Sequence, residues 1–416
     1  MRNKPRIRFK GFTEDWEQRK LGNLGSLKNG MNFSKEAMGK GYPFINLQNI
    51  FGSNVIDLTK LEKAEATDSQ LKDYNLHKGD VLFVRSSVKL EGIGEAALIS
   101  EDLKDTTFSG FIIRFRDNYG LDYNFKRFIF TTVLIRNQIM SQATNSANKN
   151  ISQSVLNNLN LFIPTKDEQS KIGLIFSKLD KCITLHQRKL EKLKLAKKAL
   201  LQKLFPKNGS QSPQIRFKGF TDAWEQRKLN DFGIATGGTS IESEFVDGGS
   251  YKVISIGSYS EESVYNDQGL RVNKTEKTKS RVLNKGNLTM ILNDKTSSGN
   301  IIGRVLLIDQ DNTYVYNQRT ERIEVDTKNF LPIFLYHMLN APEQRKYIVK
   351  ASQGNTQIYV NWSTISNIDY IIPILLSEQE KIADLFSLIN KNITLHQCKL
   401  DKLQDVKKGL LQKMFV

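Results

Sequence analysis

The sequence is internally duplicated, and this duplication limits the folds that the chain can adopt. Residues 7–21 match residues 215–229 at 13 of 15 positions, and residues 168–205 match residues 378–415 at 23 of 38 positions. Between these matching ends the two halves diverge. Two copies with a period of about 210 residues predict tandem domains rather than a solenoid of short repeats.

The second repeated stretch, at residues 168–205 and 378–415, has the apolar spacing of a helix that packs one narrow face on another helix. Apolar side chains recur at alternating intervals of four and three residues, which is typical of a coiled coil. Two such helices in one chain are most simply each other's partners. We call the predicted contact face the seam. It consists of Ile172, Phe176, Leu179, Ile183, His186, Leu190 and Leu193 in the first copy, and of Ile382, Phe386, Ile389, Ile393, His396, Leu400 and Leu403 in the second.

Two seam positions, His186 and His396, carry a polar residue where the spacing calls for an apolar one. A polar residue within a coiled coil commonly fixes register and orientation at some cost in stability. Register setting, or contact with a partner subunit, is therefore favoured over a metal site or a pH switch. A metal site would need further His or Cys ligands, and none stands beside either histidine in the sequence.

The charge balance points to a polyanionic partner. Lys and Arg exceed Asp and Glu by 17, and such a surplus supplies affinity for nucleic acid through counterion release. The alternative is a basic protein kept soluble by its charge. No apolar run approaches the roughly 20 residues of a membrane span, and no secretory signal is recognisable. With only Cys182 and Cys398, a disulfide framework is excluded, so a cytoplasmic protein without membrane contact is expected.

Each half alternates strand-like and helix-like segments, which predicts a mixed α/β domain of about 160 residues. Strand-like segments at 42–49, 76–83 and 92–99 correspond to those at 251–257, 283–290 and 302–309. Helix-like segments follow at 123–140 and 329–349. The predicted fold class is α+β, with two pseudo-twofold-related mixed α/β domains separated by an antiparallel two-helix coiled coil.

Chain order determines how the parts connect. A short Pro-, Gly- and Ser-containing stretch at residues 206–213 joins the halves. The second domain then starts close to the end of the first long helix and leads directly into the second, so the two helices must run antiparallel. At 1.5 Å per residue, a 38-residue helix makes a rod of about 57 Å. The predicted boundaries are 1–165 for the first domain, 166–206 for the first helix, 207–214 for the linker, 215–375 for the second domain and 376–416 for the second helix.

The sequence carries no recognisable catalytic signature. A P-loop, a G-x-G-x-x-G dinucleotide motif and the Asn-Pro-Pro-aromatic run of amino-methyltransferases are all missing. With four histidines, two of them on the seam, a Ser–His–Asp triad is unsupported. Scattered carboxylates could imitate a nuclease site only by chance. The interpretation is a binding protein without catalytic residues, metal ligands or a cofactor of its own.

Polar loops in both halves contain the residue types that read base edges. Asn and Gln pair with adenine, and Arg or Lys with guanine, in the major groove of DNA. Alternatively, each single residue is an ordinary polar loop side chain exposed to solvent. We call the following the candidate reader residues: Arg85, Ser86, Ser87, Lys89, Asn145, Asn148, Lys149 and Asn150 in the first half, and Asn293, Lys295, Thr296, Ser297, Arg319, Asn355, Thr356 and Gln357 in the second.

The ordered, duplicated motifs resemble those of the DNA-specificity subunits of type I restriction-modification enzymes, over residues 7–416. The motifs are W-E-Q-R-K-L at Trp16 and Trp224, L-x-K-G-D at residues 76–80, E-Q-x-K-I at both helix starts, and H-Q-x-K-L on both seams. The second half departs from the pattern at Asn287, where the first half has Asp80. This departure weakens any functional role for that carboxylate.

The resemblance implies two target-recognition domains, each reading one half of a bipartite, asymmetric DNA target. The helices would set the spacer between the halves and dock two modification subunits, which bring S-adenosylmethionine and methylate adenine. Restriction subunits would bring ATP and Mg²⁺ for translocation and cleavage, so none of the catalysis belongs to this chain. The alternative is an orphan or type II-like specificity subunit that serves a methyltransferase only. A coiled-coil scaffold that does not bind DNA is disfavoured by the charge and the duplicated polar loops.

Overall fold

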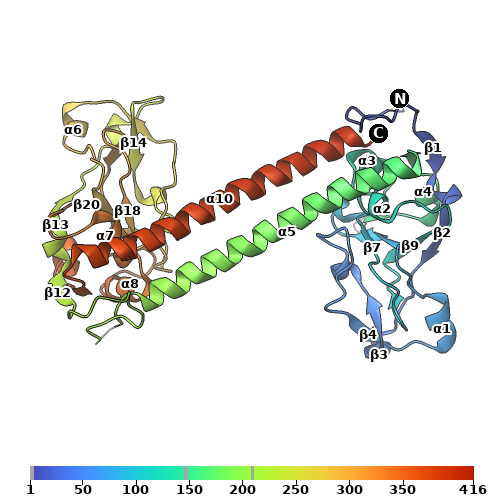
Figure 1. The fold of residues 1–416 in the computed structure, drawn as a ribbon, viewed down its shortest axis with the longest axis horizontal. Coiled ribbons are helices and arrows are strands. Elements are labelled where there is room, and N and C mark those ends of the chain that lie inside the picture. Colours follow the sequence, from blue (N-terminus) through green and yellow to red (C-terminus); the bar gives the residue numbers. More distant parts are fainter. Residues whose placement is uncertain (1–3, 145–148, 208–209) are drawn as a thin grey trace. The chain divides into compact units, whose positions relative to one another are not determined.

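The computed structural model describes residues 4–144, 149–207 and 210–416. It divides into two compact units. Unit 1 contains residues 1–187 and 397–416, and unit 2 contains residues 188–396. Two long helices, α5 (Lys166–Lys203) and α10 (Leu376–Met414), each contribute to both units (Figure 1). The helix predicted at residues 166–206 therefore ends three residues early, and Leu204, Phe205 and Pro206 follow it as non-helical, buried residues.

Unit 1 is built on two sheets. An antiparallel four-stranded sheet has the order β2 (Gly25–Asn29), β9 (Ile112–Asp117), β5 (Val81–Val84) and β7 (Ala96–Leu98). A three-stranded sheet joins β4 (Glu62–Ala64), β3 (Met38–Ile45) and β8 (Thr107–Phe108), with β3 parallel to β8. Two separate strand pairs are β1 (Glu17–Lys20) with β11 (Asn160–Ile163), and β6 (Ser86–Ser87) with β10 (Lys149–Asn150).

Unit 2 repeats this topology, which confirms that the duplication extends through the divergent region. Its four-stranded sheet has the order β13 (Gly233–Gly237), β20 (Thr320–Val325), β16 (Leu288–Ile291) and β18 (Val305–Leu307). Its three-stranded sheet is β15 (Arg271–Val272), β14 (Tyr251–Ile254) and β19 (Tyr314–Tyr316). The pairs are β12 (Glu225–Lys228) with β22 (Asp369–Ile372), and β17 (Asn293–Asp294) with β21 (Ile358–Tyr359).

Short helices connect the strands in both units. The α-helices of unit 1 are α1 (Asp68–Asp73), α2 (Tyr123–Ile129), α3 (Val133–Ser141) and α4 (Gln153–Asn157). Those of unit 2 are α6 (Glu276–Lys279), α7 (Pro332–Leu339), α8 (Pro342–Lys350) and α9 (Trp362–Ile365). The 3₁₀ turns are η1 (Leu21–Asn23), η2 (Lys35–Ala37), η3 (Leu47–Asn49), η4 (Leu90–Gly92), η5 (Leu229–Phe232), η6 (Glu242–Glu244) and η7 (Ile256–Ser258).

The segments at 123–140 and 329–349 are helical, as predicted, but neither is one continuous helix. Each segment forms two short helices, α2 and α3 in unit 1 and α7 and α8 in unit 2. In unit 2, Pro342 occupies the first position of α8, and its ring starts a helix more readily than it continues one. In unit 1, the Thr132 hydroxyl donates to the carbonyl of Ile129 at 2.7 Å where α2 ends. Apolar periodicity persists across both breaks, so it did not reveal them.

The Lys-Gly turn before the central strand of each large sheet is present in both units. Gly79 and Gly286 have φ values of +90° and +88°, a region that favours glycine. A side chain then holds each turn. The carboxylate of Asp80 accepts from the backbone N–H of His77 at 2.9 Å, and the amide oxygen of Asn287 accepts from that of Asn284 at 3.0 Å. Asn287 therefore preserves the turn-forming bond of Asp80.

The end of α10 packs in the core of unit 1, as chain order predicts. The ring of Phe415 lies 5.8 Å from that of Phe176 and 6.3 Å from that of Trp16, centroid to centroid. Further along, Lys407 Nζ lies 2.6 Å from Asp180 Oδ1. Because residue 415 lies by residue 176 and residue 407 by residue 180, these parts of the two helices run antiparallel.

Unit 2 contains the equivalent of this contact at the other end of the helices. The ring of Phe205, just beyond α5, stacks on that of Phe386 at 6.0 Å. A backbone hydrogen bond holds the C-terminal end of each long helix in the same way. Ile7 N–H donates to Lys413 O of α10 at 2.9 Å, and Ile215 N–H donates to Lys203 O of α5 at 3.0 Å. Each long helix thus begins in one unit and ends in the core of the other.

The repeated E-Q motif anchors the start of each long helix. The buried side chain of Gln169 donates to the carbonyl of Pro164 at 2.9 Å, and Gln379 does the same to Pro373 at 3.1 Å. The repeated motifs at the helix starts are therefore structural.

The seam residues are all buried or half-buried, including His396, whereas Leu185 and Leu395, one position before the histidines, are exposed.

Candidate nucleic-acid interface

The structure brings the two predicted loops of unit 1 together. β6 pairs with β10, so that Ser86 lies opposite Asn150 and Ser87 opposite Lys149. The Ile151 N–H donates to the carbonyl of Arg85 at 3.0 Å and extends the pairing. Six candidate reader residues of the first half therefore share one surface: Arg85, Ser86, Ser87, Lys89, Lys149 and Asn150. Asn145 and Asn148 lie outside the described residues.

A cavity of about 400 Å³ opens beside this strand pair, and we call it the unit 1 cavity. Arg85 and Asn150 line it together with two residues that the sequence did not single out, Asn29 at the end of β2 and Gln153 at the start of α4. The Arg85 side chain is positioned by a bond from Nη1 to the Gly110 carbonyl at 3.2 Å. Amide and guanidinium groups can satisfy the acceptors and donors of base edges.

Unit 2 joins its predicted loops in the same manner. β17 pairs with β21, with Asn293 opposite Tyr359, and the Val360 N–H donates to Leu292 O at 3.0 Å. The carboxylate of Asp294 accepts from the Thr296 hydroxyl at 2.8 Å. Thr296, a candidate reader residue, therefore stabilises the loop to which it belongs. The remaining candidates of the two loops are all exposed or half-buried: Asn293, Lys295, Ser297, Asn355, Thr356 and Gln357.

A second cavity, of about 430 Å³, opens at the equivalent place, and we call it the unit 2 cavity. The equivalence rests on matching backbone bonds. Leu292 N–H donates to Arg319 O at 2.8 Å, and Arg85 N–H donates to Phe111 O at the same distance. Position by position, Gly237 replaces Asn29, Leu292 replaces Arg85, and Trp362 replaces Gln153. The two units thus place a cavity at one topological position and line it with different side chains.

Arg319 is the one candidate reader residue that projects from the unit 2 cavity wall with a left-handed backbone. Its φ is +66°, a conformation that costs a residue other than glycine on the order of 1 kcal/mol. The bond from Leu292 to its carbonyl, and that from Gly238 N–H to Thr320 O at 2.8 Å, hold the turn in place. The exposed guanidinium is therefore presented from a fixed backbone at the cavity.

Glu321, on β20, is a cavity residue that sequence reasoning missed. Only 5% of its surface is exposed, and burial raises the pKa of its carboxyl to about 7. Gly237 faces it across the strand pair, and a Cβ at that glycine would lie 3.3 Å from Glu321 Oε2. The available signal was the alternation of β20, which places Glu321 in phase with the buried residues Ile323 and Val325.

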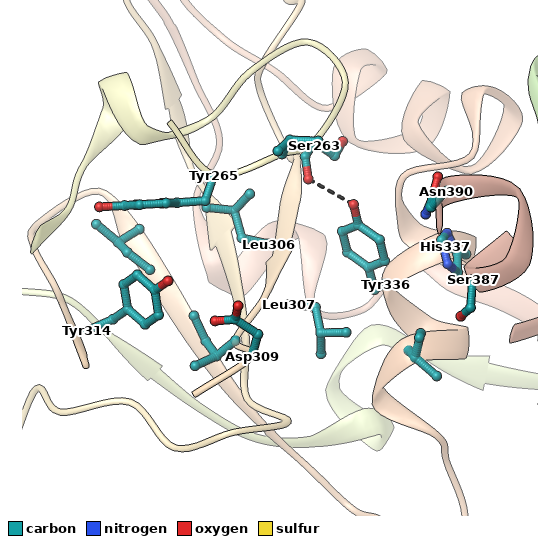
Figure 2. A pocket seen from close by; sticks show the side chains of 14 residues that line it. Ser263, Tyr265, Leu306, Leu307, Asp309, Tyr314, Tyr336, His337, Ser387 and Asn390 are labelled. Atoms are coloured by element: carbon teal, nitrogen blue, oxygen red, sulfur yellow. Dashed lines mark hydrogen bonds between the residues drawn. The ribbon is translucent and has the colours of Figure 1, made fainter. Parts of the chain in front are cut away.

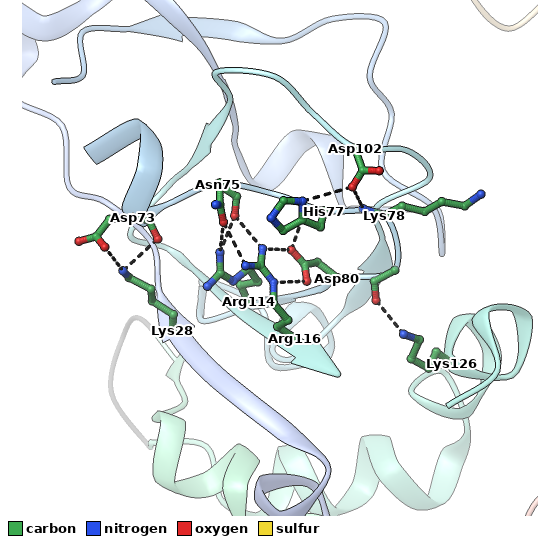
Figure 3. Close-up of polar contacts among 11 residues, drawn as sticks. Lys28, Asp73, Asn75, His77, Lys78, Asp80, Asp102, Arg114, Arg116 and Lys126 are labelled. Atoms are coloured by element: carbon green, nitrogen blue, oxygen red, sulfur yellow. Dashed lines mark hydrogen bonds and ion pairs between the residues drawn. The ribbon is translucent and has the colours of Figure 1, made fainter. Parts of the chain in front are cut away.

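Asp80 of the L-x-K-G-D motif is paired with Arg116 within unit 1 (Figure 3). Its carboxylate accepts from Arg116 Nε at 2.9 Å and from Nη2 at 2.6 Å, and Arg116 also donates to the Asn75 carbonyl at 3.1 Å. In unit 2, the matching register places Glu324 where unit 1 has Arg116. Asp80 and Arg116 are thus replaced together, by Asn287 and Glu324. This accounts for the departure at Asn287.

A further cavity of unit 2, of about 440 Å³, has no candidate reader residue in its lining. Figure 2 shows the side chains that line it. Tyr265, Tyr314, Tyr336 and His337 line it together with Ser387 and Asn390 of α10. Tyr336 closes part of its wall by donating to the Ser263 carbonyl at 2.9 Å. Burial, assisted by Lys197, lowers the pKa of His337 to about 3, so this imidazole is neutral at pH 7. The cavity has no charged group suited to phosphate.

Within the part of the chain that the structure describes, no cluster of three or more His, Cys, Asp or Glu side chains could hold a metal ion. None of the helices described has the length and apolar character needed to cross a membrane.

Residues 13–195 and 221–405, well over half of the chain, match the family Methylase_S, described as the type I restriction modification DNA specificity domain. The chain is 24% identical, over 292 residues, to the type I restriction enzyme MjaVIII specificity subunit of Methanocaldococcus jannaschii, which covers 68% of each chain. It is 30% identical, over 202 residues, to the putative MjaX specificity subunit of that organism, covering 47% of this chain and 46% of the relative.

Solved structures share the fold along the whole chain. The S subunit of a type I restriction-modification system from M. genitalium superposes with a TM-score of 0.62 at 15% identity, covering 99% of both chains. A chain from a structure of type I complex assembly and conformational transition superposes with a TM-score of 0.55 at 13% identity, covering 96% and 97%. With both halves matched by the family, the chain belongs to the DNA-specificity subunits of type I restriction-modification systems.

Proposed function

We propose that unit 1 and unit 2 each read one half of a bipartite, asymmetric DNA target for a type I restriction-modification complex. The observation that carries the proposal is the pair of cavities at one topological position. In unit 1 the cavity is lined by Arg85, Asn29 and Gln153, and in unit 2 by Glu321, Arg319 and Trp362. A shared framework with two different linings supports two different half-sites.

The candidate reader residues support the same function. The loops that carry them meet by strand pairing in each unit, and each pairing borders a cavity. Base edges are read by side chains held in a fixed position, whereas phosphate contacts set orientation and carry no sequence information. The excess of 17 positive charges supports the phosphate contacts that such a reader needs.

In this proposal α5 and α10 set the spacer between the half-sites and offer docking surfaces to two modification subunits. The chain itself is non-catalytic. The modification subunits supply S-adenosylmethionine and the methyl transfer, and restriction subunits supply ATP- and Mg²⁺-dependent translocation and cleavage. The complex, as proposed, acts in the cytoplasm.

Filter binding of the full chain to a mixed duplex DNA pool tests the proposal at a series of salt concentrations. For a protein that neutralises several phosphates, the logarithm of the binding constant falls linearly with the logarithm of the salt concentration. The slope is close to the number of phosphate contacts. The variant Arg85→Ala/Arg319→Ala should bind more weakly and more evenly across sequences. The matched control is Lys60→Ala/Lys274→Ala, which removes two exposed cations that line neither cavity. A salt-independent affinity would overturn the DNA-reading function.

A further inference from the structure

We propose that Glu321 recognises the exocyclic amino group of a cytosine in the half-site read by unit 2. The inference rests on the proposed function of unit 2 as a DNA reader and adds a specificity-determining residue to it.

Glu321 differs from every other buried acidic residue that the structure describes, because its side chain has no partner among the described residues. The other four carboxylates have internal donors. Asp80 is paired with Arg116, Glu168 with Arg8, Glu378 with Arg216, and Asp294 accepts from Thr296 and Ile301. Across the described residues, no hydrogen bond or ion pair reaches the Glu321 side chain, although it is 95% buried. A buried carboxylate without a donor is costly to fold, so Glu321, which lines the cavity, is suited to a donor that enters from outside.

The surroundings of Glu321 leave space for that partner. Its side chain lines the unit 2 cavity, and the facing residue on β13 is Gly237, the one residue type without a Cβ to fill the space. The cavity wall also presents Arg319, Gln318 and the indole of Trp362. In unit 1 the register places the apolar Ile113 at the position of Glu321. At this position unit 1 therefore has an uncharged side chain and unit 2 a carboxyl group.

The chemistry of the carboxylate selects among the bases. An ionised carboxylate is an acceptor only, so it needs a base that presents a donor. In the major groove, guanine presents acceptors and thymine presents an acceptor and a methyl group. Adenine offers its amino donor beside the N7 acceptor, whereas cytosine offers the N4 amino group alone. Cytosine is therefore the base whose groove edge fits a carboxylate without placing two acceptors together.

The pKa of Glu321 agrees with this geometry. Burial raises that pKa to about 7 in the free protein. Hydrogen bonding from an N–H donor favours the charged form of a carboxylate, so an amino group entering the cavity returns the pKa toward its ordinary range.

The test is selection of sequences from a randomised duplex pool by the full chain assembled with its modification subunits. Wild type is compared with Glu321→Gln and with the matched control Glu324→Gln, an exposed glutamate on the same strand. Glutamine pairs bidentately with adenine. Glu321→Gln should therefore lower the preference for cytosine at one position of one half-site by roughly tenfold and favour adenine there. Glu324→Gln should select the wild-type sequence.

The outcomes separate the inference from the function beneath it. If wild type selects a defined bipartite DNA sequence and Glu321→Gln selects the same one, the role of Glu321 alone is overturned. No selected sequence for wild type would overturn the reading function itself. Weaker assembly with the modification subunits and an unchanged sequence would show that Glu321 serves a protein contact. If Glu321→Gln does not fold, Gly237→Ala keeps the carboxylate, narrows its access and should cause the same loss of cytosine preference.

Discussion

Arg8 donates two hydrogen bonds, of 2.7 and 2.8 Å, to the fully buried carboxylate of Glu168, although 160 residues separate them in sequence. Arg216 makes the same two bonds, at the same distances, to Glu378 in unit 2. These pairs join the first repeated stretch to the second. The repeated motifs are therefore the framework of each unit, and the candidate reader residues lie in the divergent sequence between them.

The first prediction concerns the contribution of this pair to stability. Arg8→Ala leaves the carboxylate of Glu168 buried without a counter-charge, which should lower the free energy of unfolding of unit 1 by roughly 3 kcal/mol. Urea denaturation followed by circular dichroism measures this loss. The control is Arg6→Ala, an exposed neighbour, which should change stability by less than about 0.5 kcal/mol. Equal effects of the two variants would refute a structural role for the pair.

A second prediction separates the two roles of Asp80. Asp80→Asn keeps an acceptor for the His77 N–H, as Asn287 does in unit 2, but weakens the pairing with Arg116. Asp80→Ala removes both interactions. Asp80→Ala should therefore destabilise unit 1 by about 1 kcal/mol more than Asp80→Asn, the net contribution of one hydrogen bond. Thermal unfolding of both variants measures the difference, and identical transition midpoints would contradict it.

The third prediction concerns the aromatic residue at the end of α10. Phe415 packs on Trp16, Phe125 and Phe176, so Phe415→Ala should destabilise unit 1 by about 3–5 kcal/mol. Leu395→Ala is the control, because Leu395 is a large apolar side chain of α10 with 46% of its surface exposed. The backbone amides of unit 1 should lose protection from hydrogen exchange in Phe415→Ala and keep it in Leu395→Ala. Full protection in both variants would contradict the packing.

A fourth prediction follows from the raised pKa of Glu321. Its carboxyl titrates near pH 7 in the folded protein and near its ordinary 4.5 when unfolded. The unfolded state therefore loses its proton first, and the free energy of unfolding of unit 2 decreases as the pH rises from 4.5 through 7. The total decrease is at most about 3 kcal/mol. Glu321→Gln should be more stable than wild type at pH 8 and should differ little at pH 4. A difference independent of pH between the two proteins would contradict the raised pKa.

Much of this architecture can be predicted from the sequence because the framework was duplicated and the duplication is readable. The seam spacing identified α5 and α10, and chain order predicted that the two helices run antiparallel, as the contacts of Phe415 and Lys407 in unit 1 show. The paired loops were also recognised as polar, and strand pairing brings them together. Whether each candidate reader residue contacts a base remains a prediction.

Other features depend on contacts that sequence periodicity does not encode. The breaks between α2 and α3 and between α7 and α8 fall within continuous apolar patterns. Glu321 became prominent only when the register showed Gly237 opposite it and no donor beside it among the described residues. The coupled replacement of Asp80 and Arg116 by Asn287 and Glu324 likewise required the strand pairing of both units.

The central claim is that the two units read different half-sites through equivalent cavities. The most direct measurement is methylome sequencing of cells that express this chain with its modification subunit, compared with cells carrying Arg85→Ala or Arg319→Ala. The account predicts methylated adenines in a bipartite sequence with two unlike halves and a fixed spacer. Arg85→Ala should relax one half only, and Arg319→Ala the other. Two identical half-sites, or relaxation of both halves by either variant, would contradict it.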